Sequence, residues 1–162
     1  MIYWFFGIPG SGKTHIARLF SQMTGIPQYE GDDFHTEEDR RAVAEGMFTL
    51  EHRHAQLSRI GTALQSVRQR DALVTHPLPD KASRARVRDS GDGNVRLAYV
   101  RAPLDVTRER LSLRTNHHFG AHLLDAWLVR HWQEPEGEDC FVIENDSSAQ
   151  TLETRLKELR SI

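Results

Sequence analysis

Short apolar runs rich in aromatic and β-branched residues alternate along the chain with longer segments whose apolar residues recur at helical spacing. The short runs predict buried strands, at residues 2–6, 27–30, 72–75, 95–100 and 141–143. The longer segments predict amphipathic helices, at residues 13–23, 36–45, 49–67, 81–89, 103–114 and 123–132, with a last one around 152–159. Strands that alternate with helices favour a parallel sheet covered on both faces.

Residues at the predicted boundaries support several of these elements. Gly25 suits the C-cap of the first helix. Thr36 can cap the short helix that Gly46 ends, and Thr49 can cap the next one. Pro103 suits the first position of its helix.

Residues 7–14 (GIPGSGKT) follow the first predicted strand and lead into the first helix, and they fit the phosphate-loop pattern G-x-x-x-x-G-K-[ST] at every fixed position. The glycines let backbone N–H groups turn toward phosphate, and the helix N-terminus adds partial positive charge. Lys13 is expected to reach the β- and γ-phosphates of a nucleotide, and Thr14 to hold Mg²⁺ through its hydroxyl. The expected nucleotide contacts are Gly7, Pro9, Gly10, Ser11, Gly12, Lys13, Thr14 and His15.

Composition narrows the function classes. A length of 162 residues predicts one domain, and a formal net charge of −2 gives no basic excess for binding nucleic acid or membranes. The single cysteine, Cys140, excludes an internal disulfide framework and favours a reducing compartment. The apolar start at residues 1–8 is too short to span a membrane. We therefore expect a cytoplasmic protein that binds neither nucleic acid nor a membrane.

Two large classes of phosphate-loop protein do not fit the sequence. A GTPase would carry an Asn-Lys-x-Asp motif, which is absent. An ATP-driven motor would have an apolar strand that ends in Asp-Glu, whereas the strand at 72–75 leads into Thr75-His76. What remains is a small kinase that moves a phosphoryl group to a small acceptor.

Three further segments resemble the gluconate kinase family, which is close to the shikimate kinases. Residues 31–35 (GDDFH) look like the family's G-D-D-x-H, and Gly46 follows at the family's spacing. Residues 99–119 contain a strand end, the pattern R-L-x-x-R and a His-Phe pair, similar to the family's lid segment. Residues 133–135 (QEP) are similar to the Glu-Pro that closes the family's lid.

The resemblance implies an α/β phosphate-loop kinase fold, with a five-stranded parallel sheet in the order 2-3-1-4-5, helices on both faces and a small lid. It implies one kinase domain, residues 1–162, with an acceptor-binding insert at about 31–66 and a lid at about 114–124. The implied activity is transfer of the γ-phosphoryl group of ATP, with Mg²⁺, to a hydroxyl of a gluconate-like sugar acid. The expected partner is a small anionic polyol, and a homodimer is expected because family members are commonly dimers.

The acceptor side departs from the family. After the strand at 72–75 the family has Ser-Ala-Leu-Lys, where this chain has His-Pro-Leu-Pro at 76–79. The segment before Arg53 is one residue shorter, and Gln56 stands near a position where the family usually has tryptophan. The alternatives are therefore a kinase for a shikimate-like acid, a nucleoside or an antibiotic, and a nucleotide-binding module without transferase activity.

Carboxylates follow the second predicted strand. The acceptor hydroxyl needs a carboxylate that orients it and takes its proton. Asp32 is the candidate, both by its position after the strand and by the resemblance, and Asp33 is its competitor. Glu30 lies two residues before Asp32. Similar kinases have an Asp at the position of Glu30 that organises Mg²⁺ through water, and the resemblance implies the same role for Glu30.

Three more residues are candidates for the acceptor side. His35 either donates to the acceptor's oxygens or holds the loop in place. Arg53 suits an anionic acceptor because guanidinium binds carboxylate with two hydrogen bonds, and His76 stands where the family's pocket has its serine. The arginines of the predicted helix at 81–89 form a basic stripe that we expect to be solvated.

Arg110 and Arg114 lie four residues apart on one helix face. The resemblance implies that they contact the phosphates or the base of the nucleotide. Arg114, at the edge of the lid, would stabilise charge on the moving phosphoryl group. Together with Lys13 and Asp32 it completes the predicted catalytic set.

Overall fold

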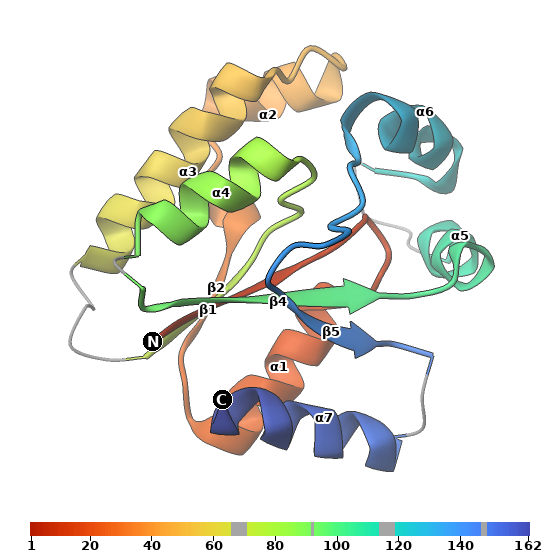
Figure 1. Cartoon of the computed structure of the whole chain (residues 1–162). Helices are drawn as coiled ribbons and strands as arrows, with labels where there is room; N and C mark the ends of the chain where they lie inside the picture. Colours follow the sequence, from red (N-terminus) through yellow and green to blue (C-terminus); the bar gives the residue numbers. More distant parts are fainter. Residues whose placement is uncertain (66–70, 92, 114–118, 147–148) are drawn as a thin grey trace.

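The computed structural model describes residues 1–65, 71–91, 93–113, 119–146 and 149–162. Within these ranges one parallel sheet is formed by β1 Ile2–Phe6, β2 Gln28–Glu30, β3 Ala72–Thr75, β4 Val95–Arg101 and β5 Phe141–Glu144. The strands lie in the order β2-β3-β1-β4-β5 (Figure 1). The predicted sheet is therefore confirmed in direction and order.

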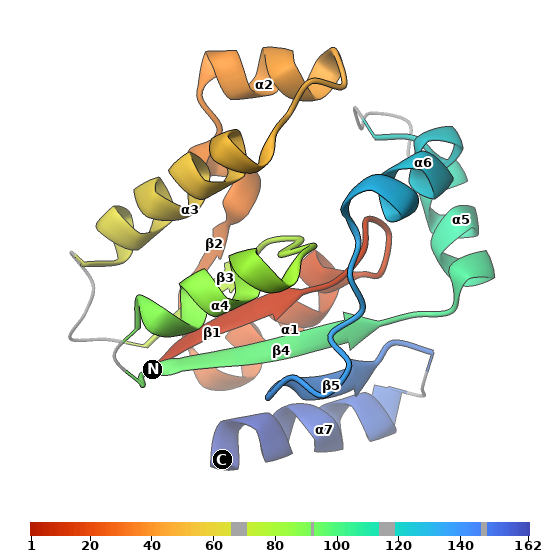
Figure 2. The same ribbon diagram turned by 45° about the horizontal axis from the view of Figure 1, so that its top comes forward.

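Helices cover both faces of this sheet. Helices α1 (Lys13–Thr24) and α7 (Ala149–Ser161) lie on one face, and α3 (Leu50–Gln65) and α4 (Lys81–Asp89) lie on the other (Figure 1). Toward the carboxyl ends of the strands lie α2 (Glu37–Ala44), α5 (Leu104–Ser112), α6 (Ala121–His131) and a 3₁₀ helix (Gly31–Phe34) (Figure 2). None of the helices in the described ranges has the length and apolarity to cross a membrane.

Strand β1 contributes to both halves of the core. Tyr3 and Phe5 pack with α1 and α7, whereas Trp4 packs with α3 and α4. The rings of Tyr3 and Phe20 meet edge to face, with centroids 5.0 Å apart. Because helices cover each face of the sheet, the strand is a continuous apolar run and not an alternating pattern.

Local signals set most helix boundaries. Gly25 ends α1 in the left-handed conformation, with φ of 72°. Thr36 and Asp39 form a capping box at the start of α2. Pro103, predicted as the first residue of its helix, instead precedes α5 as the N-cap, and α6 begins at Ala121, before the predicted start at residue 123. The extended conformation of an N-cap residue is compatible with the fixed φ of proline.

Arg84 contradicts the predicted solvated stripe on α4. Its side chain is fully buried, whereas Arg86 is exposed. Arg84 Nη2 donates to Glu138 Oε1 at 2.7 Å, and Arg84 Nη1 donates to the Leu78 carbonyl at 2.9 Å. The guanidinium also lies over the ring of Trp132, 5.9 Å from its centroid. A buried cation persists only where it is paired and hydrogen-bonded, and Glu138 provides the pairing.

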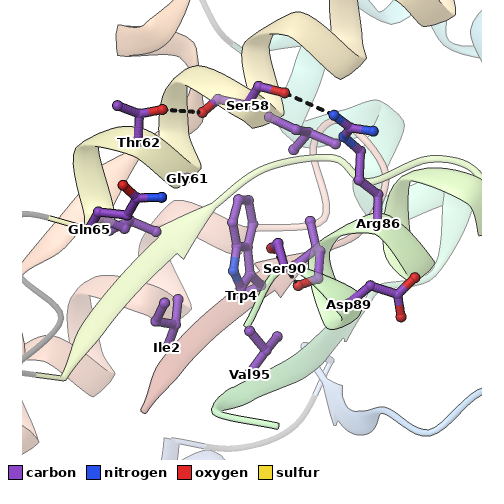
Figure 3. A pocket seen from close by; sticks show the side chains of 13 residues that line it. Ile2, Trp4, Ser58, Gly61, Thr62, Gln65, Arg86, Asp89, Ser90 and Val95 are labelled. Atoms are coloured by element: carbon purple, nitrogen blue, oxygen red, sulfur yellow. Dashed lines mark hydrogen bonds between the residues drawn. The ribbon is translucent and has the colours of Figure 1, made fainter. Parts of the chain in front are cut away.

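A pocket of about 470 Å³ lies between α3, α4 and the amino ends of β1 and β4 (Figure 3). Trp4 and Val95 line it from the sheet, and Gly61 lines it from α3. The phosphate loop leaves β1 at the opposite edge of the sheet. The pocket is therefore separate from the predicted site.

Gly61→Ala is expected to stabilise the protein by about 0.5–1 kcal/mol, because alanine favours the helix and restricts the unfolded chain. A Cβ at Gly61, inside α3, would meet no atom within 4 Å. Gly25→Ala is the matched control, since the space there is equally open but φ is +72°. We expect the control to lose about 1–2 kcal/mol from left-handed strain. Urea unfolding measures both variants, and changes of the same sign would contradict the explanation.

Candidate active site

The phosphate loop, residues 7–14, connects β1 to α1. Gly10 has φ of +84°, and a Cβ there would lie 2.8 Å from the side chain of Thr107 in α5. Gly12 has φ of +93°, and a Cβ there would collide with the side-chain amide of Asn145. The loop is therefore wrapped closely by α5 and by the turn after β5, with no room for side chains at these two positions.

Several features of the loop fit a bound anion. Gly12 caps α1 without a side-chain hydrogen bond from the described residues, and no acidic residue lies in the first turn. The N–H groups and the dipole at such a helix start attract negative charge. The Ser11 hydroxyl is buried without a hydrogen-bond partner in the described part of the chain, and Lys13 Nζ donates to a loop carbonyl at 2.9 Å. Pro9 is half-buried, and His15 is exposed on the first turn of α1.

The two predicted magnesium residues lie together. Thr14 Oγ1 donates to Glu30 Oε2 at 3.2 Å, and the Thr75 hydroxyl donates to the same carboxylate oxygen. Hydroxyl and carboxylate oxygens suit Mg²⁺, which usually keeps several waters and needs few protein ligands. No cluster of three or more His, Cys, Asp or Glu that could hold a metal occurs among the described residues. The donors present therefore fit a magnesium ion shared with substrate phosphates.

The candidate bases lie on the 3₁₀ helix directly after β2. The side chain of Asp32 is 70% exposed, with its Oδ1 3.9 Å from His35 Nδ1, and Asp33 is also exposed. Gly31 rests on the sheet, because a Cβ there would lie 2.7 Å from the Thr75 carbonyl. Both carboxylates are therefore accessible from solvent, and a ligand could reach either of them.

His76 lies under this turn and is only 3% exposed. Leu78 N–H donates to His76 Nδ1 at 3.1 Å, so the neutral ring carries its proton on Nε2. His76 Nε2 lies 3.1 Å from Gln56 Oε1, and Gln56 Nε2 donates to the Gly31 carbonyl at 2.8 Å. His76 thereby supports the turn that carries Asp32, and its predicted contact with an acceptor stays a prediction.

Stability should depend on pH through His76. Burial, and next the charge of Arg53, hold the pKa of His76 well below its ordinary value of 6.5. The folded protein keeps His76 neutral, whereas the unfolded chain takes up a proton as the pH falls below about 6.5. We expect this group to remove about 1 kcal/mol from the free energy of unfolding between pH 6.5 and 5.5.

Urea unfolding across this range checks the expectation. The His76→Gln variant should lose less stability on acidification than wild type, whatever its stability at pH 7. Burial also lowers the pKa of His131, but that contribution is common to both proteins. An identical pH dependence in the two proteins would contradict the expectation.

Arg53, the predicted clamp for a carboxylate, is paired inside the protein. It is 7% exposed, and its Nη1 donates to Asp80 Oδ2 at 2.9 Å. Burial lowers the pKa of Arg53, and the Asp80 carboxylate opposes that effect. Asp80 also caps α4, accepting from Ser83 N–H at 2.8 Å. Binding of an acceptor carboxylate by Arg53 stays a prediction, with Asp80 as an internal competitor.

Arg110 lies against the phosphate loop. Its Nη1 donates to the Ser11 carbonyl at 3.3 Å, and its Nη2 donates to the Asn145 carbonyl at 3.1 Å. Arg114 and the rest of 114–118 lie outside the described residues, so the role of Arg114 stays a prediction. The remainder of the predicted lid, 119–124, leads into and begins α6.

Asn145 is a residue of the site that the sequence pattern did not predict. Its Nδ2 donates to the Ser11 carbonyl at 2.6 Å, although the two residues lie 134 positions apart. The available signal was a polar residue directly after the carboxyl end of a parallel strand, where ligands of such sheets bind.

The comparisons with known proteins agree with this geometry. No family model matches the sequence. A Dictyostelium discoideum protein described as "Probable gluconokinase" is 27% identical over an alignment of 130 residues, and the match covers 75% of this chain and 65% of that protein. The structure of a gluconokinase from Sinorhizobium meliloti is 26% identical, with a TM-score of 0.83, and the match covers 98% of this chain and 91% of that one. The chain is gluconokinase-like.

The chain is also similar to kinases that are not described as gluconokinases. An adenylyl-sulfate kinase of Chloroflexus aurantiacus is 27% identical over an alignment of 113 residues, and the match covers 68% of this chain and 60% of that protein. A sugar kinase from Janibacter sp. matches with a TM-score of 0.84 at 24% identity, covering 99% of this chain and 94% of that one, which supports the fold alone. The predicted phosphate-loop kinase fold and the resemblance to gluconate kinases are confirmed. The chain spans 60–65% of the length of these two curated relatives.

Proposed function

We propose that the chain is an ATP-dependent kinase that transfers the γ-phosphoryl group to a hydroxyl of a gluconate-like sugar acid. The observation that carries this proposal is the 3.2 Å hydrogen bond between Thr14 of the phosphate loop and Glu30 of β2. That bond joins the donor side of the site to the strand whose end carries Asp32. The similarity to gluconokinases supports the class of acceptor.

In the proposed reaction the acceptor oxygen bonds to the γ-phosphorus, and the bond from that phosphorus to the bridging oxygen of ADP breaks. Asp32 orients the acceptor hydroxyl and takes its proton. Lys13 and the N–H groups of the phosphate loop bind the donor phosphates and offset their charge. Thr14, and Glu30 through water, would hold Mg²⁺, which when bound neutralises phosphate charge.

The same proposal covers the rest of the predicted site. Arg110 and Arg114 act on the nucleotide side, and residues 114–124 close as a lid that excludes water and limits wasteful hydrolysis of ATP. The acceptor binds against the insert at 31–66, with His35 and Arg53 within reach of it. All of these parts belong to one kinase domain of 162 residues.

The test is acceptor-dependent release of ADP, measured with a coupled assay at saturating ATP and Mg²⁺. The panel contains gluconate, other sugar acids, the corresponding neutral sugars, shikimate, nucleosides, an aminoglycoside and a reaction without acceptor. We expect sugar acids to raise turnover well above the rate without acceptor. If no sugar acid does so, the gluconate-like function is wrong.

A second candidate is phosphorylation of adenylyl sulfate. Similarity to the Chloroflexus aurantiacus adenylyl-sulfate kinase favours it, as does the Asp80 carboxylate, which occupies the predicted clamp for a sugar-acid carboxylate. Adenylyl sulfate therefore belongs in the acceptor panel. ADP release with adenylyl sulfate alone would establish this activity, and ATP binding without any transfer would indicate a nucleotide-binding module.

A further inference from the structure

Asn145, in the turn after β5, forms a hydrogen bond with a backbone carbonyl of the phosphate loop. Asn145 Nδ2 donates to the Ser11 carbonyl at 2.6 Å, and Arg110 Nη1 donates to the same oxygen at 3.3 Å. Asn145 is itself held in place, because its N–H donates to the Arg101 carbonyl at 2.7 Å and its own carbonyl accepts from Arg110 Nη2 at 3.1 Å. A loop carbonyl thus meets two donors from elements far away in the sequence.

This contact determines which way the next N–H group points. The peptide that joins Ser11 to Gly12 is trans, since the described chain contains no cis peptide bond. In a planar trans peptide the C=O and the N–H point in opposite directions. With the Ser11 oxygen directed at Asn145, the Gly12 N–H is directed to the other side of the peptide, away from Asn145.

The Gly12 N–H also makes no hydrogen bond within helix α1. Gly12 is the N-cap of α1, so its N–H is one of the groups without an acceptor in the helix. The Asn145 amide contacts the loop backbone directly, because it occupies the space that a Cβ on Gly12 would need. Rotation of this peptide would therefore break hydrogen bonds on its outer side.

We propose that Asn145 is a positioning residue that fixes the Ser11–Gly12 peptide so that the Gly12 N–H is directed at the donor phosphates. Asn145 touches neither the phosphates nor the acceptor, and it acts through Gly12. The inference rests on the nucleotide-binding half of the proposed function and is independent of the acceptor. Among the contacts of the described residues, removal of Asn145 leaves the Ser11 carbonyl with the longer bond from Arg110 alone.

The experiment is calorimetric titration of ADP and, separately, of adenosine into wild type, Asn145→Ala and Asn145→Asp. The aspartate variant has nearly the shape of asparagine but cannot donate to the Ser11 carbonyl. We expect the Kd for ADP to rise about tenfold in both variants, the size of a lost hydrogen bond to a positioned group. The Kd for adenosine, which lacks the phosphates, is expected to stay at the wild-type value.

Asn94→Ala is the control, because it makes the same change in the turn before β4, at the other edge of the sheet, and its affinity for ADP should match wild type. If ADP binds the two Asn145 variants as it binds wild type, Asn145 does not position the loop. Equal weakening of ADP and adenosine, or a large drop in Tm for both variants, would mean a merely structural role and overturn the inference. If wild type itself binds no ADP, the proposed function fails and this inference fails with it.

Discussion

Replacing Asp32 by asparagine is expected to lower kcat by about 10²–10⁴-fold, the usual contribution of a positioned general base. Asparagine keeps the size of the side chain and its preference for the turn, but it cannot take a proton from the acceptor hydroxyl. The loss should appear in kcat, because Lys13 and the loop that bind the nucleotide are left intact. The affinity for ADP should therefore stay close to that of wild type.

Asp33→Asn is the matched control, since it makes the same chemical change one residue further along the same 3₁₀ helix. Its kcat should remain near the wild-type value. Steady-state assays with the best acceptor from the panel measure both variants. A large loss of kcat in Asp33→Asn alone would mean that Asp33, and not Asp32, is the general base. Full activity in both variants would mean that neither carboxylate acts as the base.

Replacing Arg84 by methionine is expected to lower the free energy of unfolding by about 3–5 kcal/mol, because the change leaves a buried carboxylate without its main partner. Arg84 is fully buried, and the Glu138 side chain that it binds is 8% exposed. Against the opposing effect of burial, hydrogen bonds from Arg84 and Arg88 lower the pKa of Glu138. Arg84 also donates to the carbonyls of Leu78 and Gln133, so it ties α4 to the segment after α6.

Arg86→Met is the matched control on the same helix, since Arg86 is exposed and its Nη2 donates only to the Ser58 hydroxyl in the described contacts, at 3.0 Å. We expect a change within about 0.5 kcal/mol there. Urea unfolding gives both values. The double variant Arg84→Met/Glu138→Gln should recover part of the loss, because no buried charge is then left unpaired. Equal effects in Arg84→Met and Arg86→Met would contradict the explanation.

Much of the fold was predictable because its determinants act over a few residues. Gly25 ends α1 with a left-handed φ that glycine adopts without strain, and α2 begins with a capping box between Thr36 and Asp39, only three positions apart. The apolar run of β1 needed only its own composition to indicate a buried strand. Strands alternating with helices then favoured a parallel sheet, and the resemblance to a known family supplied the order of its strands.

For the polar residues of the site, the sequence predicted their positions relative to the strands but not their hydrogen-bond and ion-pair partners. The positions of Glu30 at the end of β2 and of Asp32 after it follow from the strand pattern, as does the position of His76 after β3. The sequence could not reveal that His76 is buried with both ring nitrogens engaged, or that Arg53 is already paired with Asp80. Each of these contacts joins two elements that meet only when the sheet and its helices have assembled.

Periodicity, capping and glycine geometry are local properties, so the strands, the helices, the phosphate loop and the residues that follow each strand could be located from the sequence alone. Which polar groups are buried and paired depends instead on how the assembled fold brings distant segments together. Arg84 appears in the sequence as one of a row of solvated arginines, yet it binds Glu138, 54 residues away. Asn145 carries no motif, yet it holds the Ser11 carbonyl of the phosphate loop across 134 residues. The surroundings of a polar side chain depend on what the folded chain brings beside it, and those neighbours have no fixed spacing in the sequence.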